Sequence, residues 1–362
     1  MGQRVRDICM GVTAVKIFWT PNGNSGIFCH QYATVDRNVS EIKDLEEDVT
    51  VIRDDVIDAR ERIGGLVEKT PLIEGEVAGT RVWLKCECLQ TGGAFKLRGA
   101  TNRLLQLSPE EREKGVVAFS SGNHARGVAI AAKRLGMRAV IVMPADAPQV
   151  KVDGTRAEGA EIVFYDRRTE SREAIAARIA GETGATVVPS FDDPAIVAGQ
   201  GTAGLEIVEQ FGGSPPRIVI PCGGGGLASG IALAVPEAEI VVVEPEGWDD
   251  MARSLELGKI VPVGPDAPNT FCDAIMTPRV SPITFGILRR RNAQAASVSD
   301  PEVEGAIRFA WSKHQLVVEP GAAVALAAVL AGKIPPLEDT VVVVSGGNVD
   351  PELHARITAQ GA

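Results

Sequence analysis

The chain has 362 residues, enough for two domains or one large α/β unit, and 45% of them are hydrophobic although only 4% are aromatic. Its net charge of −10, without a basic block, argues against nucleic acid or an anionic membrane as a partner and favours small molecules. None of the six cysteines forms a C-x-x-C pair, and no apolar run reaches the ~18 residues of a membrane span. We therefore expect reduced thiols in a cytoplasmic enzyme.

Residues 1–48 show little helical or strand periodicity, and we expect a poorly ordered extension outside the catalytic unit. From residue 49 onward, apolar strands alternate with helices. Strands are predicted at residues 82–87, 116–119, 139–143, 161–165, 185–189, 218–220, 240–244 and 341–344. Helices are predicted at residues 54–62, 96–107, 127–135, 149–158, 172–183, 227–235, 301–314 and 321–330. This alternation predicts an α/β fold with parallel sheets covered by helices on both faces.

Four of the predicted strands run into small polar loops, at residues 90–96, 120–124, 222–227 and 345–348. In parallel α/β sheets, ligands bind at the carboxyl ends of the strands. We therefore expect the four loops to share one site.

Lys96 stands out in the first loop, because it follows Gly92, Gly93, Ala94 and Phe95. A lysine in an apolar pocket has a lowered pKa, and its neutral amine can form a Schiff base with a carbonyl compound. Taken alone, the segment is better explained as a surface lysine in a glycine-rich turn.

The loop of Gly223 to Leu227 joins a strand to a helix, so its backbone N–H groups could bind a phosphate. Gly223, Gly225 and Ala228 also match the dinucleotide pattern G-x-G-x-x-G/A, and Glu244 ends the next strand about 20 residues later, where a ribose partner would lie. A phosphate cup, a nicotinamide site and a simple tight turn therefore all stay open for this segment.

The loop of Ser120 to His124 opens a helix with hydroxyls and free N–H groups, which suit a carboxylate or phosphate as well as an ordinary helix cap. Ser345 to Asn348 on its own is typical of a turn. No second histidine or cysteine is placed to make a metal pair or a catalytic dyad with His124.

Together, these motifs resemble the pyridoxal-phosphate enzymes of fold type II, the tryptophan-synthase-β fold, and above all its serine/threonine dehydratase and serine racemase group. The resemblance covers residues 50–350 approximately, in the right order. It implies a large cofactor-binding domain (49–114 plus 193–362), a small substrate domain (115–192) and a homodimer.

The resemblance also implies roles for individual residues. Lys96 would form the Schiff base with pyridoxal 5′-phosphate, Phe95 would pack near the cofactor, and Ser121 would face Lys96 across it. Asn123 would contact the phenolic oxygen of the cofactor, and Ser345 its pyridine nitrogen. The phosphate would bind at Gly223, Gly224, Gly225, Gly226 and Leu227. The substrate carboxylate would be held by Ser120, Asn123, His124 and Arg172.

The implied reaction is β-elimination of a β-hydroxy-α-amino acid to a 2-oxo acid and ammonia, with Lys96 removing the Cα proton. L-Threonine and L-serine are the leading substrates, and 3-hydroxyaspartate and phenylserine are alternatives. A racemase of the same fold, with Ser121 as a second base, also stays open. A nicotinamide dehydrogenase or a non-catalytic amino-acid-binding relative is less favoured, because each leaves an intact Lys96 unexplained.

Glu244, the carbonyl of Trp248 and Asp250 resemble the divalent-cation site of the family, where oxygen ligands at this spacing suit Mg²⁺ or Ca²⁺. A solvated acidic turn is the competing interpretation. Three residues depart from the common family pattern near the site: Cys88, Ala94 and Arg126. They remove no catalytic group, but they leave the identity of the substrate open.

Overall fold

The computed structural model describes residues 51–147, 149–335 and 337–359, and the strand residues 7–10, 13–16, 18–19 and 25–26. Two compact units emerge, residues 1–48 and residues 49–362. In the first unit, β1 (Asp7–Met10) pairs antiparallel with β2 (Thr13–Lys16), and β3 (Phe18–Trp19) with β4 (Ser25–Gly26). The sequence predicts a poorly ordered extension over residues 1–48. Apart from these four strands, that segment lies outside the described residues, so the prediction is not tested.

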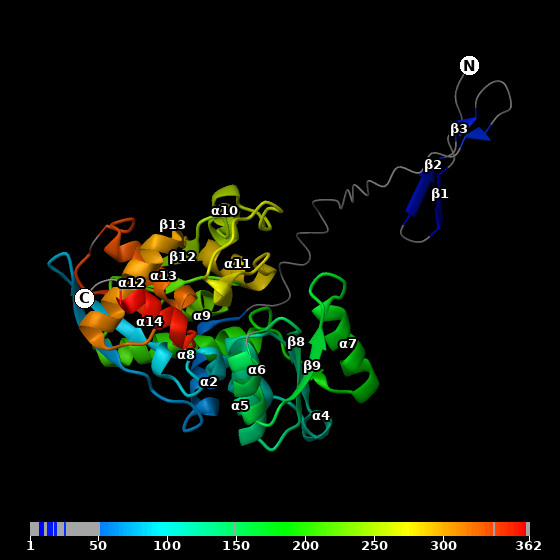
Figure 1. The fold of residues 1–362 in the computed structure, drawn as a ribbon, viewed down its shortest axis with the longest axis horizontal. Helices are drawn as coiled ribbons and strands as arrows, with labels where there is room; N and C mark the ends of the chain where they lie inside the picture. Colours follow the sequence, from blue (N-terminus) through cyan, green and yellow to red (C-terminus); the bar gives the residue numbers. More distant parts are fainter. Residues whose placement is uncertain are drawn as a thin grey trace. The chain divides into compact units, whose positions relative to one another are not determined.

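The second unit contains two sheets, drawn in Figure 1. The six-stranded sheet has the order β13-β12-β11-β14-β6-β5 and is parallel except for the β5–β6 pair, and the four-stranded sheet has the order β10-β7-β8-β9 and is parallel throughout. Their strands are β5 (Leu72–Val77), β6 (Thr80–Cys86), β7 (Val116–Phe119), β8 (Ala139–Pro144), β9 (Glu161–Tyr165), β10 (Thr186–Val187), β11 (Arg217–Pro221), β12 (Glu239–Pro245), β13 (Gln294–Val298) and β14 (Thr340–Val344).

Helices connect these strands and cover the sheets. They are α2 (Arg53–Ile63), α3 (Lys96–Leu105), α4 (Pro109–Lys114), α5 (Asn123–Arg134), α6 (Gln149–Ala157), α7 (Arg172–Thr183), α8 (Pro194–Phe211), α9 (Gly226–Ala234), α10 (Asp250–Leu257), α11 (Pro282–Arg290), α12 (Asp300–His314), α13 (Pro320–Leu330) and α14 (Pro351–Ala359), with short 3-10 helices η1 (Glu87–Leu89) and η2 (Asp273–Ile275). The local sequence determines where several of these helices begin. At the start of α8, for example, the Asp193 side chain accepts a hydrogen bond from Ile196 N (3.0 Å), and Pro194 is the first residue of the helix.

The central strands β11, β12 and β14 of the six-stranded sheet are buried on both faces, which explains why they are almost continuous runs of apolar residues. Along β14, Val341 and Val343 pack into the core with residues of α2, α8, α9 and α11, whereas Val342 and Val344 pack into the core with residues of α12 and α13. Successive side chains of a strand point to opposite faces. Two separate cores therefore sandwich this sheet.

The four-stranded sheet is built in the same way. Val116 and Ala118 of β7 join a core with α3 and α5, and Val117 joins a core with α7 on the other face. In Figure 1, α5 and α6 lie on one side of β8 and β9, and α7 lies on the other. The expected α/β fold with helices on both faces of parallel sheets is thus confirmed.

Within the described residues, no helix is both long and apolar enough to cross a membrane. Cys86, Cys88, Cys222 and Cys272 are all buried and unpaired. None of these four cysteines forms a disulfide in the described part of the chain.

Candidate active site

Three of the four polar loops meet because their strands are neighbours. β11, β14 and β6 lie side by side in the six-stranded sheet, and the loops at residues 222–227, 345–348 and 90–96 follow their carboxyl ends. The fourth loop follows β7, and its helix α5 joins the same core as α3. The sheet order therefore brings together segments that are far apart in the sequence.

The loop before Lys96 is held directly against the loop after β14. Phe95 N donates to Ser345 O (3.2 Å), and Gly347 N donates to Gly93 O (2.8 Å). Gly93 has φ +78°, and a Cβ at this position would overlap the Asn348 side chain. A side chain at position 93 would consequently force the two loops apart.

Lys96 is the first residue of α3, and its Nζ donates to the Ser190 carbonyl at 2.9 Å. The Nζ atom also lies 5.1 Å from the centre of the Phe95 ring. The side chain is only partly exposed, and desolvation lowers the pKa of its amine to about 8. Lys96 is therefore a desolvated lysine with an accessible neutral form, and not a surface lysine in a flexible turn.

We expect this lowered pKa to govern how fast the cofactor-free protein reacts with an aldehyde. Only the neutral amine attacks a carbonyl, so the rate should rise about tenfold per pH unit below pH 8 and level off above it. An ordinary lysine, whose amine has a pKa of 10.5, would show a rise that continues through pH 10. Stopped-flow mixing of the apoprotein with pyridoxal over this pH range measures the rate, and a profile without a plateau near pH 8–9 would contradict the assignment.

The glycine loop after β11 forms a cradle that no side chain could share. Gly225 has φ +84°, and a Cβ on Gly224 would overlap the Phe191 ring. α9 begins at Gly226, so the free N–H groups of its first turn and the positive end of its dipole face this loop. The cradle fits a phosphate group, and Phe191 follows directly after the residue whose carbonyl accepts from Lys96.

Asn123 lies at the centre of a chain of hydrogen bonds. Asn348 Nδ2 donates to Asn123 Oδ1 at 2.8 Å and to Gly92 O at 2.8 Å. Asn123 Nδ2 donates to Glu319 Oε1 at 2.5 Å. Glu319 is buried, and this desolvation raises the pKa of its carboxyl to about 7 despite the bond from Asn123. Asn123 is thus rigidly oriented by two partners from distant parts of the chain.

His124 is buried as a neutral ring. Its Nε2 lies 2.9 Å from the Val188 carbonyl, so Nε2 carries the proton, and desolvation together with the charge of Lys96 lowers its pKa to about 3. Its Nδ1 is buried without a partner among the described residues. An unprotonated Nδ1 offers a carboxylate no hydrogen, so the predicted role of His124 as a carboxylate ligand finds no donor in this structure, and an anion at this loop would have to be bound by the backbone N–H groups that begin α5.

The other predicted site residues are placed as follows. Ser345 is buried at the end of β14, and Ser121 is half-buried just before Gly122, the residue that precedes α5. Ser120 Oγ accepts from Gly122 N at 3.1 Å and shapes the turn. Arg172 is the first residue of α7 and pairs with its neighbour Glu173 at 2.8 Å, with its guanidinium 5.5 Å from the Phe119 ring. Arg172 therefore lies beside the strand that leads to Ser120, but in this structure it is engaged elsewhere.

The predicted cation ligands form a buried acidic turn between β12 and α10. Both Glu244 oxygens accept backbone N–H groups, from Met251 (3.0 Å) and Ala252 (2.8 Å). Asp250 is buried and its Oδ2 has no partner in the part of the chain described. Burial and the proximity of Asp250 raise the pKa of Glu244, and burial raises the pKa of Asp250 to about 7. Trp248 N donates to Pro245 O (3.0 Å) in the same turn.

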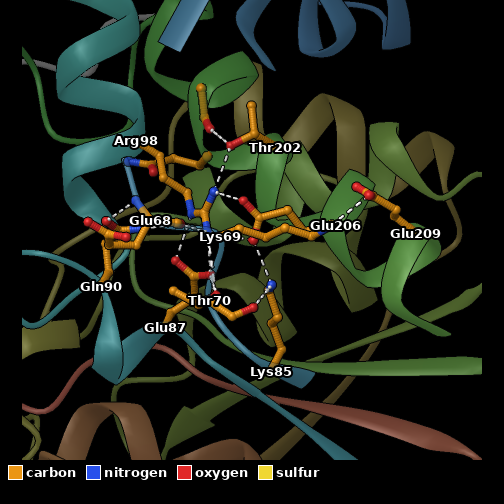
Figure 2. A network of polar contacts seen from close by, with 12 residues as sticks. Glu68, Lys69, Thr70, Lys85, Glu87, Gln90, Arg98, Thr202, Glu206 and Glu209 are labelled. Carbon is orange, nitrogen blue, oxygen red and sulfur yellow. Dashed lines mark hydrogen bonds and ion pairs between the residues drawn. The ribbon is translucent and has the colours of Figure 1, made fainter. Parts of the chain in front are cut away.

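A buried ionic network anchors α3 at Arg98, two residues after Lys96 (Figure 2). The Arg98 guanidinium binds Glu87 through Nε (2.7 Å) and Nη2 (2.8 Å), and Glu206 through Nη1 (2.6 Å) and Nη2 (2.8 Å). Lys85 Nζ reaches the same Glu206 at 2.6 Å. Two cations face two carboxylates, so the network is neutral overall. It joins β6, η1, α3 and α8, the elements that set the position of Lys96.

Four residues of the site were not found by sequence reasoning as site residues: Ser190, Phe191, Glu319 and Asn348. Asn348 ends a loop that the sequence marks only as a turn. Glu319 directly precedes the wholly apolar helix α13, and an acid in that position is a usable signal for a buried carboxylate. Ser190 and Phe191 carry no local signal, because their role comes from the return of the chain between β10 and α8.

Comparison with known proteins agrees with this geometry. Residues 63–346 match the family described as "Pyridoxal-phosphate dependent enzyme". The chain is 43% identical to L-threo-3-hydroxyaspartate ammonia-lyase from Pseudomonas sp (84% of this chain, 97% of that protein) and 40% identical to serine racemase from Schizosaccharomyces pombe (85% and 97%). The structure of maize serine racemase superposes with a TM-score of 0.81 at 35% identity, over 86% of this chain and 98% of that one.

The family match spans the loops of Lys96, Asn123, Gly223–Leu227 and Ser345 in one continuous alignment. It confirms the resemblance to fold type II, and the names of the relatives agree both with an ammonia-lyase and with the racemase alternative. The nicotinamide alternative is weakened, because the Glu244 carboxylate that would bind the ribose caps α10 instead. The chain therefore belongs to the family of pyridoxal-phosphate dependent enzymes.

Proposed function

We propose that this enzyme is an ammonia-lyase that eliminates the β-hydroxyl group of a β-hydroxy-α-amino acid and yields a 2-oxo acid and ammonia. The observation that carries the proposal is Lys96, whose desolvated amine donates to the carbonyl of Ser190, the residue before the Phe191 ring that packs on the glycine loop. L-Serine, L-threonine and 3-hydroxyaspartate are the candidate substrates. Relatives carry the names of ammonia-lyases for two of them.

Lys96, the glycine cradle and Asn123 each have a separate role in the proposed reaction. When bound, the cofactor withdraws electron density from the Cα of the amino acid and so makes the Cα proton acidic. Lys96 takes this proton, since its lowered pKa of about 8 keeps a useful fraction of neutral amine at neutral pH. The glycine cradle and the start of α9 would hold the phosphate, and Asn123 would orient the ring through its oxygen.

Ser345 favours elimination over transamination in this proposal. It is a neutral hydroxyl at the position predicted to meet the ring nitrogen, where an acid would hold a proton on that nitrogen. Phe95 supports the same geometry, because its backbone N–H is bonded to Ser345 O and its ring packs beside the Lys96 amine. Lys96 would thus act as a fixed base, and Ser345 would leave the ring nitrogen of a bound cofactor without an added proton.

A panel of hydroxyamino acids tests the proposal. The purified enzyme with pyridoxal 5′-phosphate is incubated with L-serine, L-threonine, L-threo-3-hydroxyaspartate and phenylserine, and 2-oxo acid and ammonia are measured together. We expect the two products in equal amounts from at least one of these substrates. If the cofactor-loaded enzyme releases neither product from any of these substrates, the proposal is wrong.

A racemase activity is the second candidate, and Ser121 favours it. Ser121 is half-buried at the start of the helix that packs on α3, and a hydroxyl opposite Lys96 could exchange a proton on the other face of the substrate. Chiral chromatography of the same reactions distinguishes the two activities. If Ser121→Ala abolishes interconversion of enantiomers and spares release of the 2-oxo acid, both activities are present and Ser121 serves only racemisation.

The acidic turn of Glu244 and Asp250 is proposed as a Mg²⁺ or Ca²⁺ site, with the Trp248 carbonyl as a third ligand. No three acidic, histidine or cysteine side chains gather as a metal cluster in the described residues, so backbone oxygen and water would complete the shell. The fit rests on two buried carboxyls whose pKa values are raised and on the unpartnered Oδ2 of Asp250. A cation there would supply the missing countercharge.

We expect the stability of the protein to depend on pH and metal together. In EDTA, the Asp250 carboxyl keeps its proton up to about pH 7 in the folded state, because burial raises its pKa. In the unfolded state the same carboxyl loses its proton near pH 3.8. The free energy of unfolding should therefore fall as the pH rises from about 4 to about 7. Mg²⁺ or Ca²⁺ should raise the melting temperature at pH 7.5, and Asp250→Asn should lose that response. Calorimetry with Mg²⁺ or Ca²⁺ and with EDTA measures the melting temperature in both conditions. Equal melting temperatures with cation and with EDTA would contradict the site.

Three further expectations belong to the same proposal. These are the division into a large domain (49–114 plus 193–362) and a small domain (115–192), a homodimer and a cytoplasmic location. The two separate sheets support the first, since all strands of the four-stranded sheet fall within residues 115–192.

A further inference from the structure

A small cavity of about 100 Å³ borders Asn123 on the side toward α6. Arg126 of α5 and Lys151 of α6 line it from two sides. Its volume is several times the ~10–15 Å³ that one water needs, so a small charged group fits. Gly122 and Gly154 also line the cavity. A Cβ added to either glycine would have no other atom within 4 Å, so the open space reaches the backbone at both positions.

Arg126 has unused hydrogen-bonding capacity. Its Nη1 donates to Asn348 Oδ1 at 3.1 Å, while its Nε is buried without a partner among the residues the structure describes. A guanidinium presents several donors in one plane and binds a carboxylate with two parallel bonds. A carboxylate in the cavity would satisfy donors that the protein itself leaves unpaired.

The charges around the cavity favour an anion. Arg126 and Lys151 are positive, and Asp273 of η2 pairs with Lys151. Glu319 is the second acid nearby, and desolvation raises its pKa to about 7, so it carries only part of a negative charge at neutral pH. Arg126 therefore keeps an uncompensated positive charge in a partly buried position.

Hydrogen bonds connect this cavity to the reaction site. The chain runs from Arg126 to Asn348, from Asn348 to Asn123, and from Asn123 to Glu319. A group bound at Arg126 is thereby placed at a fixed distance from Asn123, which the proposed function puts against the cofactor ring. The cavity shares Asn123 with the proposed catalytic site, and no residue of the glycine loop lines it.

We propose that the cavity beside Arg126 and Lys151 binds the side-chain carboxylate of a dicarboxylic β-hydroxy-α-amino acid, so that 3-hydroxyaspartate is the preferred substrate class. This inference rests on the proposed function, because it assigns that activity a substrate. The α-carboxylate stays at the N–H groups that begin α5, and the second carboxylate pairs with the Arg126 guanidinium. Serine and threonine lack this second group and leave the Nε of Arg126 without a partner among the described residues.

The test compares Arg126→Gln with a matched control, Lys133→Gln. Both remove one positive charge from α5, but Lys133 is exposed and pairs with Glu158 at 3.2 Å, away from the cavity. For the wild type, kcat/KM for L-threo-3-hydroxyaspartate should exceed that for L-threonine. Arg126→Gln should lower the former by about 10- to 150-fold, the effect of a lost hydrogen bond to a charged group, and the latter by less than about threefold. Lys133→Gln should change neither.

A second variant and a binding measurement keep the inference testable if Arg126→Gln fails to fold. Gly154→Leu places a side chain in the open space of the cavity without altering a charge, and should reproduce the selective loss. Malonate, an unreactive dicarboxylate, should raise the melting temperature of the wild-type holoenzyme more than acetate does. That difference should disappear in Arg126→Gln.

The outcomes separate this inference from the proposed function. If the wild type releases 2-oxo acid from L-threonine but not from 3-hydroxyaspartate, the inference fails and the proposed function stands. If Arg126→Gln lowers kcat/KM equally for both substrates, Arg126 serves the α-carboxylate and the inference is overturned. If no hydroxyamino acid yields a 2-oxo acid, the proposed function itself fails.

Discussion

Lys96→Ala is expected to reduce kcat for β-elimination by at least about 10²–10⁴-fold, the range of a lost general base. The expected loss is larger than that, because the same amine also attaches the cofactor. The structure supports both roles, since the Lys96 amine is desolvated, has a pKa of about 8 and is oriented by the Ser190 carbonyl. Reduction with borohydride followed by peptide mass spectrometry should locate the cofactor on Lys96 in the wild type and nowhere in the variant.

The control is Lys69→Ala, which removes an exposed lysine that pairs with Glu209 at 2.6 Å. It should retain full activity and the full content of attached cofactor. Added methylamine or ethylamine should restore a measurable part of the activity of Lys96→Ala if a missing base is the cause of its loss. If Lys96→Ala keeps wild-type turnover, or if the cofactor is found on another lysine, the catalytic assignment is wrong.

Arg98→Met is expected to be the most destabilising single substitution in the buried ionic network of Figure 2. Arg98 is fully buried and holds both Glu87, which is also fully buried, and Glu206. Burial disfavours the Glu87 charge, yet the Arg98 guanidinium holds the Glu87 pKa below its usual range. Removal of Arg98 leaves Lys85 alone to face two carboxylates, which costs about 3–5 kcal/mol in the free energy of unfolding.

The matched control is Arg138→Met, whose pair with Glu161 has the same N···O distance of 2.7 Å as the Arg98–Glu87 pair but is solvent-exposed. That change should cost less than about 1 kcal/mol. Urea unfolding of both variants measures the difference. Equal costs for the two variants would show that burial does not set the strength of the network. Arg98→Lys should recover part of the loss, since it restores one buried positive charge without the bidentate geometry.

Much of the fold could be predicted from local pattern. The strands of residues 116–119 and 161–165 were predicted with their true limits, and that of residues 341–344 to within one residue. They are apolar runs bounded by turn residues. Helix α8, the longest in the described residues, was missed, because its small residues Gly199, Gly201 and Gly204 weaken the helical signal. Those glycines are needed where α8 packs closely against α3 and α9.

Other elements were missed for different reasons. β5 contains Glu74, Gly75 and Glu76, and it is an antiparallel edge strand with only its last residue fully buried. β13 is also an edge strand, and its sequence of alanine, serine and glutamine carries almost no strand propensity. The predicted start of α5 at residue 127 was four residues late, since the helix begins at Asn123 within the polar loop.

The candidate site divides in the same way. Lys96, Asn123 and the glycine loop could be predicted, because each lies at the carboxyl end of a strand and has an unusual local composition. Glu319, Ser190 and Asn348 could not be assigned roles, because their contacts with Asn123 and Lys96 depend on chain segments more than 90 residues apart. The strand order of both sheets brings those segments together, since Lys96 and Asn348 follow β6 and β14 of the six-stranded sheet, whereas Asn123 and Ser190 follow β7 and β10 of the four-stranded sheet.

The most direct test of the account is one time course with the wild-type holoenzyme and Lys96→Ala on L-threo-3-hydroxyaspartate, L-threonine and L-serine. Release of 2-oxo acid and ammonia and the enantiomeric composition of the remaining amino acid are followed in the same samples. We predict equimolar 2-oxo acid and ammonia from the wild type and neither product from the variant. Interconversion of enantiomers without any 2-oxo acid, or product formation that persists in Lys96→Ala, would contradict the account.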